Sequence, residues 1–319
     1  MKLIGFTEEA IKGQGEDSGL SLMNGNAAAI AVFDGCGGSG SRTYPEFNNE
    51  SGAKISSFTC SCALQDWFEH PDNGIREFGF QGVPHARIAQ SLKQALDEFL
   101  RARGEKVVSS SGLKGKLYID FPTTMATALL EKGASSTRCI LIWAGDSRIY
   151  YFSNKGLRLL TSDDTEGGMD ETTMNPDGTM SQVIALDSRY TLHSAEFILR
   201  EPCIIFSATD GVFSYYPSPM DFETMLLETL FASSSADEWI SLLSSSIGKV
   251  ASDDYSLQMA CVGYSSFGSL VKSFSDYRRL FKSKVALPLS RCREADDREG
   301  IISIWNRYRS RYFELLRRV

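Results

Sequence analysis

The segment Ala28-Ala29-Ile30-Ala31-Val32-Phe33-Asp34-Gly35 runs from a fully apolar stretch into an aspartate and a glycine. Two later apolar segments lead into the same pair of residue types, at Asp146 and at Asp210, and a fourth begins just after Asp253-Asp254. Neighbouring strands of an antiparallel sheet run in opposite directions, so three strand ends and one strand start can lie at the same edge. We therefore expect these aspartates to lie close together.

Several carboxylates at one edge of a sheet need a chemical explanation. A single Asp-Gly pair after a strand is usually only a turn. Three or four buried carboxylates at one edge are unfavourable unless a cation neutralises them. Since all the candidate ligands are oxygens, the pattern favours Mg²⁺ or Mn²⁺ over Zn²⁺. Two such ions about 4 Å apart can activate a bridging water and hold both oxygens of an in-line phosphoryl displacement.

A hairpin adds a fifth acidic residue to this edge. The turn signal Asn24-Gly25-Asn26 joins the strand Ser18–Met23 to the strand that leads into Asp34. If the register is centred on the middle of the turn, Glu16 lies opposite Asp34. Like charges across a hairpin are destabilising, which favours a bridging cation. A slip of one residue, or an extra loop residue, would separate the pair.

The pattern of apolar residues predicts strands joined by hairpins, with pairs of helices between groups of strands. The predicted strands are Ser18–Met23, Ala27–Phe33, Thr123–Leu130, Arg138–Ala144, Arg148–Phe152, Phe197–Leu199, Cys203–Ala208 and Ser256–Gly263. The predicted helices are Glu50–Trp67, His85–Arg103, Asp221–Ser233 and Asp237–Gly248. This order predicts an α+β fold in which helices pack on antiparallel sheets.

Composition excludes several classes of protein. The chain has 319 residues, of which 42% are hydrophobic and 23% are charged, as expected of a soluble globular protein. The formal net charge of −7 argues against nucleic acid as a partner. We find no apolar run of the roughly 18 residues that a membrane span needs, and no signal peptide. Seven cysteines without a Cys-x-x-Cys pair favour a reducing cytoplasm, and three scattered histidines argue against zinc.

The C-terminal part of the chain is basic, whereas the rest is acidic. Residues 264–319 contain thirteen Lys and Arg against six Asp and Glu, a net charge of +7, which leaves −14 for residues 1–263. Apolar residues recur there at steps of three and four, with arginines between them, as in an amphipathic helix. These apolar residues are Ile301, Trp305, Tyr308, Tyr312, Leu315 and Val319. We expect one domain over residues 1–264 and a basic helical extension over 265–319 that docks on it; a partner protein or an acidic surface is the alternative.

Seven segments, taken in order, resemble the motifs of the PPM family of metal-dependent, 2C-type Ser/Thr protein phosphatases. They are Gly15–Ser18, Val32–Gly38, Thr123–Ala126, Ala144–Arg148, Leu160–Asp164, Ala208–Phe213 and Asp253–Leu257. Each segment alone is a weak signal, but the ordered set is specific. The resemblance extends from about Gly5 to Gly263. It implies a four-layer α-β-β-α sandwich, with two central antiparallel sheets flanked by helix pairs.

The resemblance also implies a set of metal ligands. By family position, Asp34 bridges two ions, and the carbonyl of Gly35 joins one of them. Glu16 serves the second ion, whereas Asp210 and Asp253 serve the first. Family spacing favours Asp253 over its neighbour, a choice that the strand pattern alone leaves open.

Two further acidic residues have roles by family position. Asp17 would hold metal-bound water, and Asp146 is linked with Asp210 to a third, weaker ion. The implied activity is hydrolysis of phosphoserine or phosphothreonine in proteins by a metal-bridging water, with two Mn²⁺ or Mg²⁺ ions. A phosphorylated protein is the expected substrate, within a Ser/Thr kinase pathway. The alternatives are a pseudophosphatase that binds without turnover and a phosphatase for small phosphoesters.

The chain departs from the family pattern at three places. Lys12 stands where an arginine often grips the substrate phosphate, so we expect a working but weaker grip; a solvated surface lysine is the alternative. Cys36 replaces a histidine tied to proton delivery, and a thiol is a poorer acid near neutrality. Asp163-Asp164 replaces an Asp-His pair, so the loop Glu166–Thr179 beside the active site is expected to be built differently.

Overall fold

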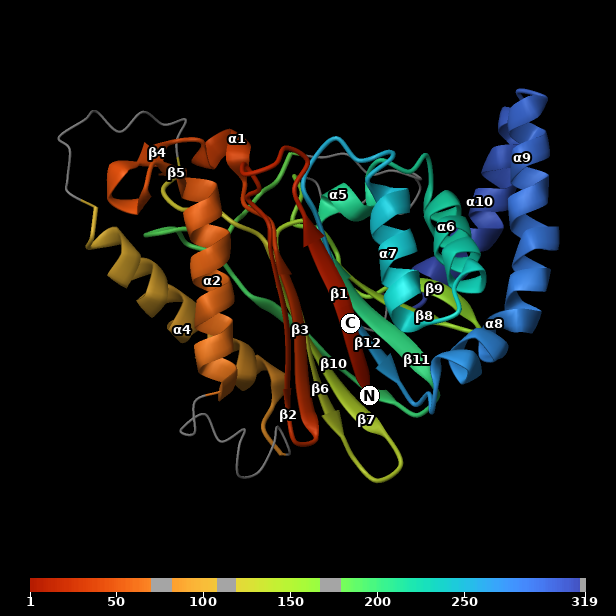
Figure 1. Ribbon diagram of the computed structural model, residues 1–319, viewed down its shortest axis with the longest axis horizontal. Coiled ribbons are helices and arrows are strands. Elements are labelled where there is room, and N and C mark those ends of the chain that lie inside the picture. Colours follow the sequence, from red (N-terminus) through yellow and green to blue (C-terminus); the bar gives the residue numbers. More distant parts are fainter. Residues whose placement is uncertain (70–81, 108–118, 167–178, 316–319) are drawn as a thin grey trace.

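The computed structural model describes residues 1–69, 82–107, 119–166 and 179–315, and it contains two stacked antiparallel sheets with helices on both outer sides (Figure 1). The first sheet has the order β1 (Lys2–Glu8), β12 (Tyr255–Val262), β11 (Cys203–Ala208), β8 (Arg148–Ser153) and β9 (Gly156–Leu159). The second has the order β10 (His193–Leu199), β7 (Thr137–Ala144), β6 (Met125–Lys132), β3 (Ala27–Phe33) and β2 (Ser18–Asn24). The predicted α+β, four-layer architecture is confirmed.

The helices form the two outer layers. On the second sheet lie α2 (Gly52–Glu69) and α4 (His85–Gly104). On the first sheet lie α6 (Pro219–Ala232), α7 (Ala236–Ile247), α8 (Phe267–Phe281), α9 (Leu287–Glu294) and α10 (Arg298–Tyr312), with the π-helix η3 (Lys282–Ala286) between α8 and α9. Smaller elements are α1 (Gly37–Gly40), α5 (Asp210–Phe213), the 3-10 helix η1 (Pro45–Phe47) and the two-stranded ladder of β4 (Thr43–Tyr44) and β5 (Glu50–Ser51).

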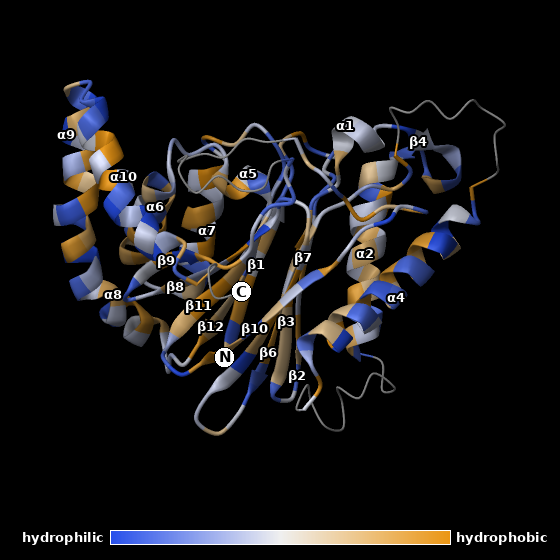
Figure 2. Cartoon of the chain, turned by 180° about the vertical axis from the view of Figure 1, so that it is seen from behind, coloured by the Kyte–Doolittle hydropathy of each residue, from blue (hydrophilic) through white to orange (hydrophobic). Residues whose placement is uncertain are grey.

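Strand β3 is apolar throughout because both of its faces are buried. Ile30 and Val32 belong to the apolar layer between the two sheets, together with Ile205 of β11. Ala31 and Phe33 belong to the layer under α2 and α4. The sequence of a central strand that is covered on both faces is a continuous apolar run, whereas a strand covered on one face alternates apolar and polar residues. Figure 2 shows the same arrangement as hydrophobic strands in the middle of the molecule.

The turn between β2 and β3 corrects the predicted register. The structure has a two-residue loop, Gly25-Asn26, where the prediction centred the hairpin on one residue. Glycine suits this loop because its φ is 58°, a conformation that other residues rarely adopt. The extra loop residue shifts the register by one, so the continued hairpin places Asp17, and not Glu16, opposite Asp34.

Four strands were not predicted, namely β1, β9 and the two-residue strands β4 and β5, and one predicted helix begins later than expected. β1 is an edge strand with a single buried residue, Ile4, so its sequence lacks a strong pattern. β9 has only four residues. The helix expected from Glu50 begins at Gly52, because residues 50 and 51 pair with β4.

The C-terminal helices share an apolar core with the first sheet. Trp305 and Phe313 are 2% exposed, in the same cluster as Trp239 of α7. A fully buried carboxylate, Glu223 of α6, accepts hydrogen bonds from two tyrosines of this region, Tyr277 at 2.6 Å and Tyr308 at 2.7 Å. The domain boundary after residue 264 stays a prediction. Val319 of the predicted amphipathic helix lies outside the described residues.

Across the described ranges, no helix combines the length and the apolar character that a bilayer span requires.

Candidate metal centre

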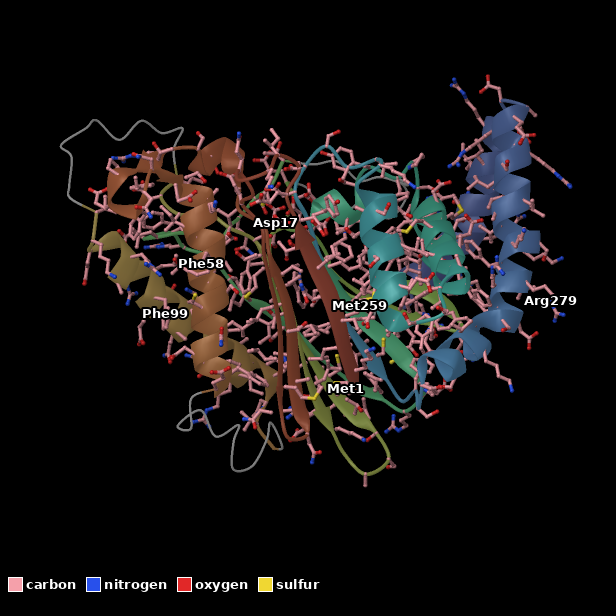
Figure 3. All side chains as sticks on the ribbon, viewed as in Figure 1. Met1, Asp17, Phe58, Phe99, Met259 and Arg279 are labelled. Atoms are coloured by element: carbon pink, nitrogen blue, oxygen red, sulfur yellow. The ribbon has the colours of Figure 1, made fainter. Side chains whose placement is uncertain are left out.

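The acidic residues singled out in the sequence line one cleft of about 480 Å³ at the end of the sheets. The acids lining it are Glu16, Asp17, Asp34, Asp146, Asp210, Asp253 and Asp254. Figure 3 shows Asp17 at this end, where Figure 1 places α1 and α5. The acids come from the start of β2, the ends of β3, β7 and β11, and the start of β12. Five segments that are far apart in sequence therefore bring carboxylates to one place.

The main chain around Asp34 is held firmly. Its carbonyl oxygen accepts from the amide of Thr124 and from the hydroxyl of Thr123, both at 2.8 Å. At the next position only glycine fits, because a Cβ on Gly35 would lie 2.6 Å from the carbonyl oxygen of Glu16. The Asp34–Gly35 corner therefore has little freedom, and it aims the carboxylate at a defined point of the cleft.

Asp146 follows a glycine that the loop requires. Gly145 has a φ of 90°, and its amide donates to Oδ2 of Asp164 at 2.9 Å. Oδ1 of Asp146 is buried and has no hydrogen-bond partner within the described part of the chain. A buried carboxylate oxygen without a donor is costly, and a nearby cation would offset that cost.

Glu16 is positioned by a residue that the sequence did not assign. Asp254 accepts from the amides of Glu16 at 2.6 Å and of Ala10 at 2.8 Å, and thereby fixes the loop before β2. Ser51 donates its hydroxyl to Glu16 and accepts from the amide of Lys54 at the start of α2. Asp254 therefore fixes the main chain, whereas Asp253, the residue before it, is the predicted metal ligand. The sequence does not show which of two adjacent aspartates has which role.

Asp17 is held from the neighbouring sheet. The hydroxyl of Thr209 donates to Oδ2 of Asp17 at 2.8 Å and accepts from the amide of Ser256 at 2.9 Å. Thr209 is another residue that the sequence did not indicate, since it lies 192 positions from the carboxylate that it binds. This contact ties the second sheet to the first beneath the cleft.

The electrostatics of the cleft call for positive charge. Burial raises the pKa of Asp34 well above its ordinary value, and the charges of Asp17 and Asp210 raise it further. Burial likewise raises the pKa of Asp17 strongly and that of Glu16 and Asp210 to a lesser degree. Mutual repulsion in a poorly solvated site is relieved by a proton or a cation. The donor set therefore fits divalent ions.

The acidic cleft fits divalent ions that keep part of their hydration shell. Among the described residues, no three His, Cys, Asp or Glu side chains stand close enough together to hold one ion by themselves. Mg²⁺ usually retains several waters and is bound through one or two carboxylates. An acidic cleft with separated carboxylates suits that mode of binding, whereas a closed cage of side chains would not be expected here.

The pH dependence of stability in the absence of metal follows from these shifts. Burial, with the charge of Asp210, raises the pKa of Asp146 from 3.8 to about 7. Between about pH 4 and pH 7 the folded chain therefore binds more protons than the unfolded chain, so stability falls as pH rises. We expect the melting temperature in chelator to decrease from pH 5 to pH 7.5, and to decrease less in Asp146→Asn. Equal decreases in both proteins would contradict this.

Lys12 and Cys36 differ in how closely they approach the acids. Lys12 is exposed and lines a neighbouring hollow with Glu9 and Asp17, not the acidic cleft itself. Cys36 does line the cleft, and its Sγ lies 3.9 Å from the carbonyl oxygen of Asp34. Burial and the surrounding negative charges raise the pKa of Cys36 well above its ordinary value, so the group stays a thiol.

Asp163 and Asp164, the pair that stands in place of the family's Asp-His, fix residues next to the site. Asp163 accepts from the buried guanidinium of Arg148 at 2.7 Å. Asp164 binds the amide of Gly145 and lies 2.8 Å from Nε2 of His193. Most of the loop Glu166–Thr179, residues 167–178, lies outside the described residues.

The comparisons with known proteins agree with this geometry. Residues 14–247 match the model of the protein phosphatase 2C family. No curated protein matches the sequence. The fold is similar to that of the Mycobacterium tuberculosis serine/threonine phosphatase PstP/Ppp, at 15% identity and a TM-score of 0.55, over 82% of this chain and 99% of that one.

Two other solved structures are similar to the same extent. Serine/threonine phosphatase Stp1 from Staphylococcus aureus is 14% identical, with a TM-score of 0.55, over 82% of this chain and 95% of that one. The catalytic domain of PstP in complex with two manganese ions is 16% identical, with a TM-score of 0.52, over 82% of this chain and 97% of that one. At these identities the likeness concerns the fold.

Proposed function

Because the chain belongs to the protein phosphatase 2C family, we propose that it is a metal-dependent protein serine/threonine phosphatase centred on Asp34. The observation that carries the proposal is the cleft itself, in which seven carboxylates from separate segments meet. The raised pKa values of Asp34 and Asp146 and the unpartnered Oδ1 of Asp146 support a site that binds cations.

Asp34, Glu16, Asp210, Asp253 and the carbonyl of Gly35 would hold two divalent ions between them, and water would complete the coordination of each ion. When bound, Mn²⁺ or Mg²⁺ ions stabilise the negative charge on the phosphoryl oxygens and lower the pKa of the water that they bind. That relatives such as PstP bind two manganese ions supports this assignment.

The chain's own groups would orient the reaction. Asp17, fixed by Thr209, would accept a hydrogen bond from the attacking water and hold it in line with the phosphorus. Asp146 would join Asp210 at a third, weaker ion position. Cys36 keeps its proton because its pKa is raised, so we assign it to filling the turn and not to protonating the leaving group.

The expected substrate is a phosphoserine or phosphothreonine protein from a Ser/Thr kinase pathway. The acidic cleft lies open at the end of the sheets, which supports a phosphate carried on a larger molecule. All seven cysteines are free, which supports a reducing compartment such as the cytoplasm.

Lys12 provides a test of phosphate binding. If it contacts the substrate phosphate, as its place beside Asp17 allows, Lys12→Ala should raise KM for a phosphopeptide by roughly tenfold, the size of a lost charge-assisted hydrogen bond. kcat should change little, because the contact exists in both bound states. An unchanged KM in steady-state assays would show that Lys12 is a solvated surface residue.

Release of p-nitrophenol from p-nitrophenyl phosphate, with Mn²⁺ and with chelator, tests the proposal. We expect turnover that requires the metal. A folded protein without metal-dependent turnover would instead favour the pseudophosphatase. Faster hydrolysis of small phosphoesters than of phosphopeptides would overturn the protein-substrate assignment.

A further inference from the structure

A buried arginine lies directly beneath the acidic cleft. Nε and Nη2 of Arg148 donate to the carboxylate of Asp163 at 2.7–3.2 Å. Its Cζ lies 4.2 Å from the ring centre of Phe213, at the end of α5, and α5 begins with Asp210. Arg148 itself follows Asp146 by two positions. The side chain is therefore packed against both segments that deliver Asp146 and Asp210 to the cleft.

The position of this guanidinium affects the charge of the cleft. Arg148 lies two residues after Asp146, and its guanidinium packs on Phe213 of the short helix that begins with Asp210, so its positive charge lies next to both segments. A small displacement of Arg148 would change how readily this side of the cleft holds positive ions.

A pair of tyrosines connects Arg148 to the C-terminal helix. Arg148 donates a hydrogen bond to the hydroxyl oxygen of Tyr150, and the hydroxyl groups of Tyr150 and Tyr312 are hydrogen-bonded to each other. The two rings lie 6.5 Å apart, and the tyrosines are 1% and 2% exposed. Tyr312 is the last residue of α10, so the final helix contributes directly to the polar network beneath the cleft.

A buried network of this kind acts as a unit. Removing the Tyr312 hydroxyl would take away one hydrogen-bond partner of Tyr150, and the side chain of Tyr150 could then shift away from Arg148. The guanidinium would then be fixed by Asp163 and Phe213 alone. The family match ends at residue 247, whereas α10 begins at Arg298, so the family assignment does not account for this contact.

We propose that Tyr312 is a positioning residue for the metal centre, through which the C-terminal helix sets the affinity of the cleft for divalent ions by way of Tyr150 and Arg148. The inference rests on the proposed function, because it concerns the same cleft. It assigns the C-terminal region a role in ion binding in addition to covering the first sheet.

Tyr308 offers a matched control on the same helix. It is 4% exposed, against 2% for Tyr312, and lies one turn earlier. Its hydroxyl donates to Glu223 of α6 at 2.7 Å. Tyr308→Phe and Tyr312→Phe therefore each remove one buried hydroxyl from α10, but only the second removes a hydroxyl bonded to Tyr150.

The test is Mn²⁺ affinity, measured by isothermal titration calorimetry on the full-length wild type and both variants, with turnover of p-nitrophenyl phosphate as a second measurement. We expect Tyr312→Phe to raise Kd for Mn²⁺ by about fivefold, somewhat less than the loss typical of a residue that contacts a metal ligand directly. Tyr308→Phe should stay within about twofold of the wild type, whatever its effect on the melting temperature.

Three results would overturn the inference: an unchanged Kd in Tyr312→Phe, an equal increase in both variants, or a wild type that binds no Mn²⁺ in the cleft. A wild type that binds Mn²⁺ but has no turnover would instead contradict the proposed function. The comparison of Kd values would still decide the role of Tyr312, so the two failures can be told apart.

Discussion

Replacing Asp34 with asparagine is expected to lower metal-dependent turnover by at least about a thousandfold. In the proposed centre this carboxylate lies between two ions, and asparagine removes the negative charge that holds them. The ions supply several kcal/mol of transition-state stabilisation, and each 1.36 kcal/mol corresponds to a factor of ten in rate. Steady-state assays with a phosphopeptide and saturating Mn²⁺ would measure the loss.

The same substitution should stabilise the metal-free protein. Burial and the neighbouring acids raise the pKa of Asp34, so its ionised form is unfavourable in the folded state at neutral pH. An amide relieves this repulsion, and in a chain of this size each 1 kcal/mol raises the melting temperature by roughly 2–4 °C. We therefore expect a higher melting temperature in chelator but no further rise on adding Mn²⁺.

Asp97→Asn is a suitable control for this pair of measurements. Asp97 lies outside the cleft, on α4, where it accepts hydrogen bonds from Lys93 and Tyr190. Its replacement should lower the melting temperature and leave turnover unchanged. Retention of metal-dependent turnover by Asp34→Asn would contradict the account of the centre.

Removing the side chain of Trp305 is expected to be the most damaging single change in the C-terminal helices. The residue is 2% exposed and packs with Tyr308, Tyr312 and Phe313. Truncation of a buried tryptophan to alanine costs about 3–5 kcal/mol. Trp305→Ala should therefore lower the melting temperature by roughly 10 °C, given the relation between free energy and melting temperature in a protein of this size.

Ile302 on the same helix is the matched control, because it is 53% exposed. Ile302→Ala should change the melting temperature by no more than a degree or two. Equal effects of the two substitutions would contradict the packing of α10 on the first sheet. A shortened chain that ended at Phe267 and kept full stability and turnover would contradict it as well.

The central strands were predictable because each is covered on both faces. Ala27–Phe33 and Cys203–Ala208 are apolar throughout, and a continuous apolar run bounded by turn residues leaves little choice of structure. β1 escaped prediction because an edge strand with one buried residue shows no such pattern. The start of α2 was misplaced because pairing of residues 50 and 51 with β4 depends on tertiary contacts.

The acids of the cleft were predictable because strand ends and hairpins bring them together. The register of Glu16 and Asp17 was wrong by one residue because loop length decides it, and a three-residue turn signal is compatible with more than one length. Neither Thr209 nor the role of Asp254 in fixing the main chain could be found from the sequence. Thr209 acts on Asp17, 192 residues away, and Asp254 acts on the amide of Glu16, 238 residues away, so only the folded chain brings donor and acceptor together.

The contact between the C-terminal helix and the residues next to the cleft could not be predicted from the sequence either. The three- and four-residue spacing predicts an amphipathic helix containing Tyr308 and Tyr312, but it does not distinguish them. In the structure one hydroxyl binds Glu223 and the other binds Tyr150. Residues with the same spacing and burial thus contribute to different parts of the molecule.

A crystal structure of the chain with Mn²⁺, in which anomalous scattering locates the ions, would show whether Asp34 is the centre of the site. We expect two ions in the acidic cleft, about 4 Å apart, with the carboxylate of Asp34 between them. Manganese bound elsewhere, or a cleft whose ions make no contact with Asp34, would contradict it.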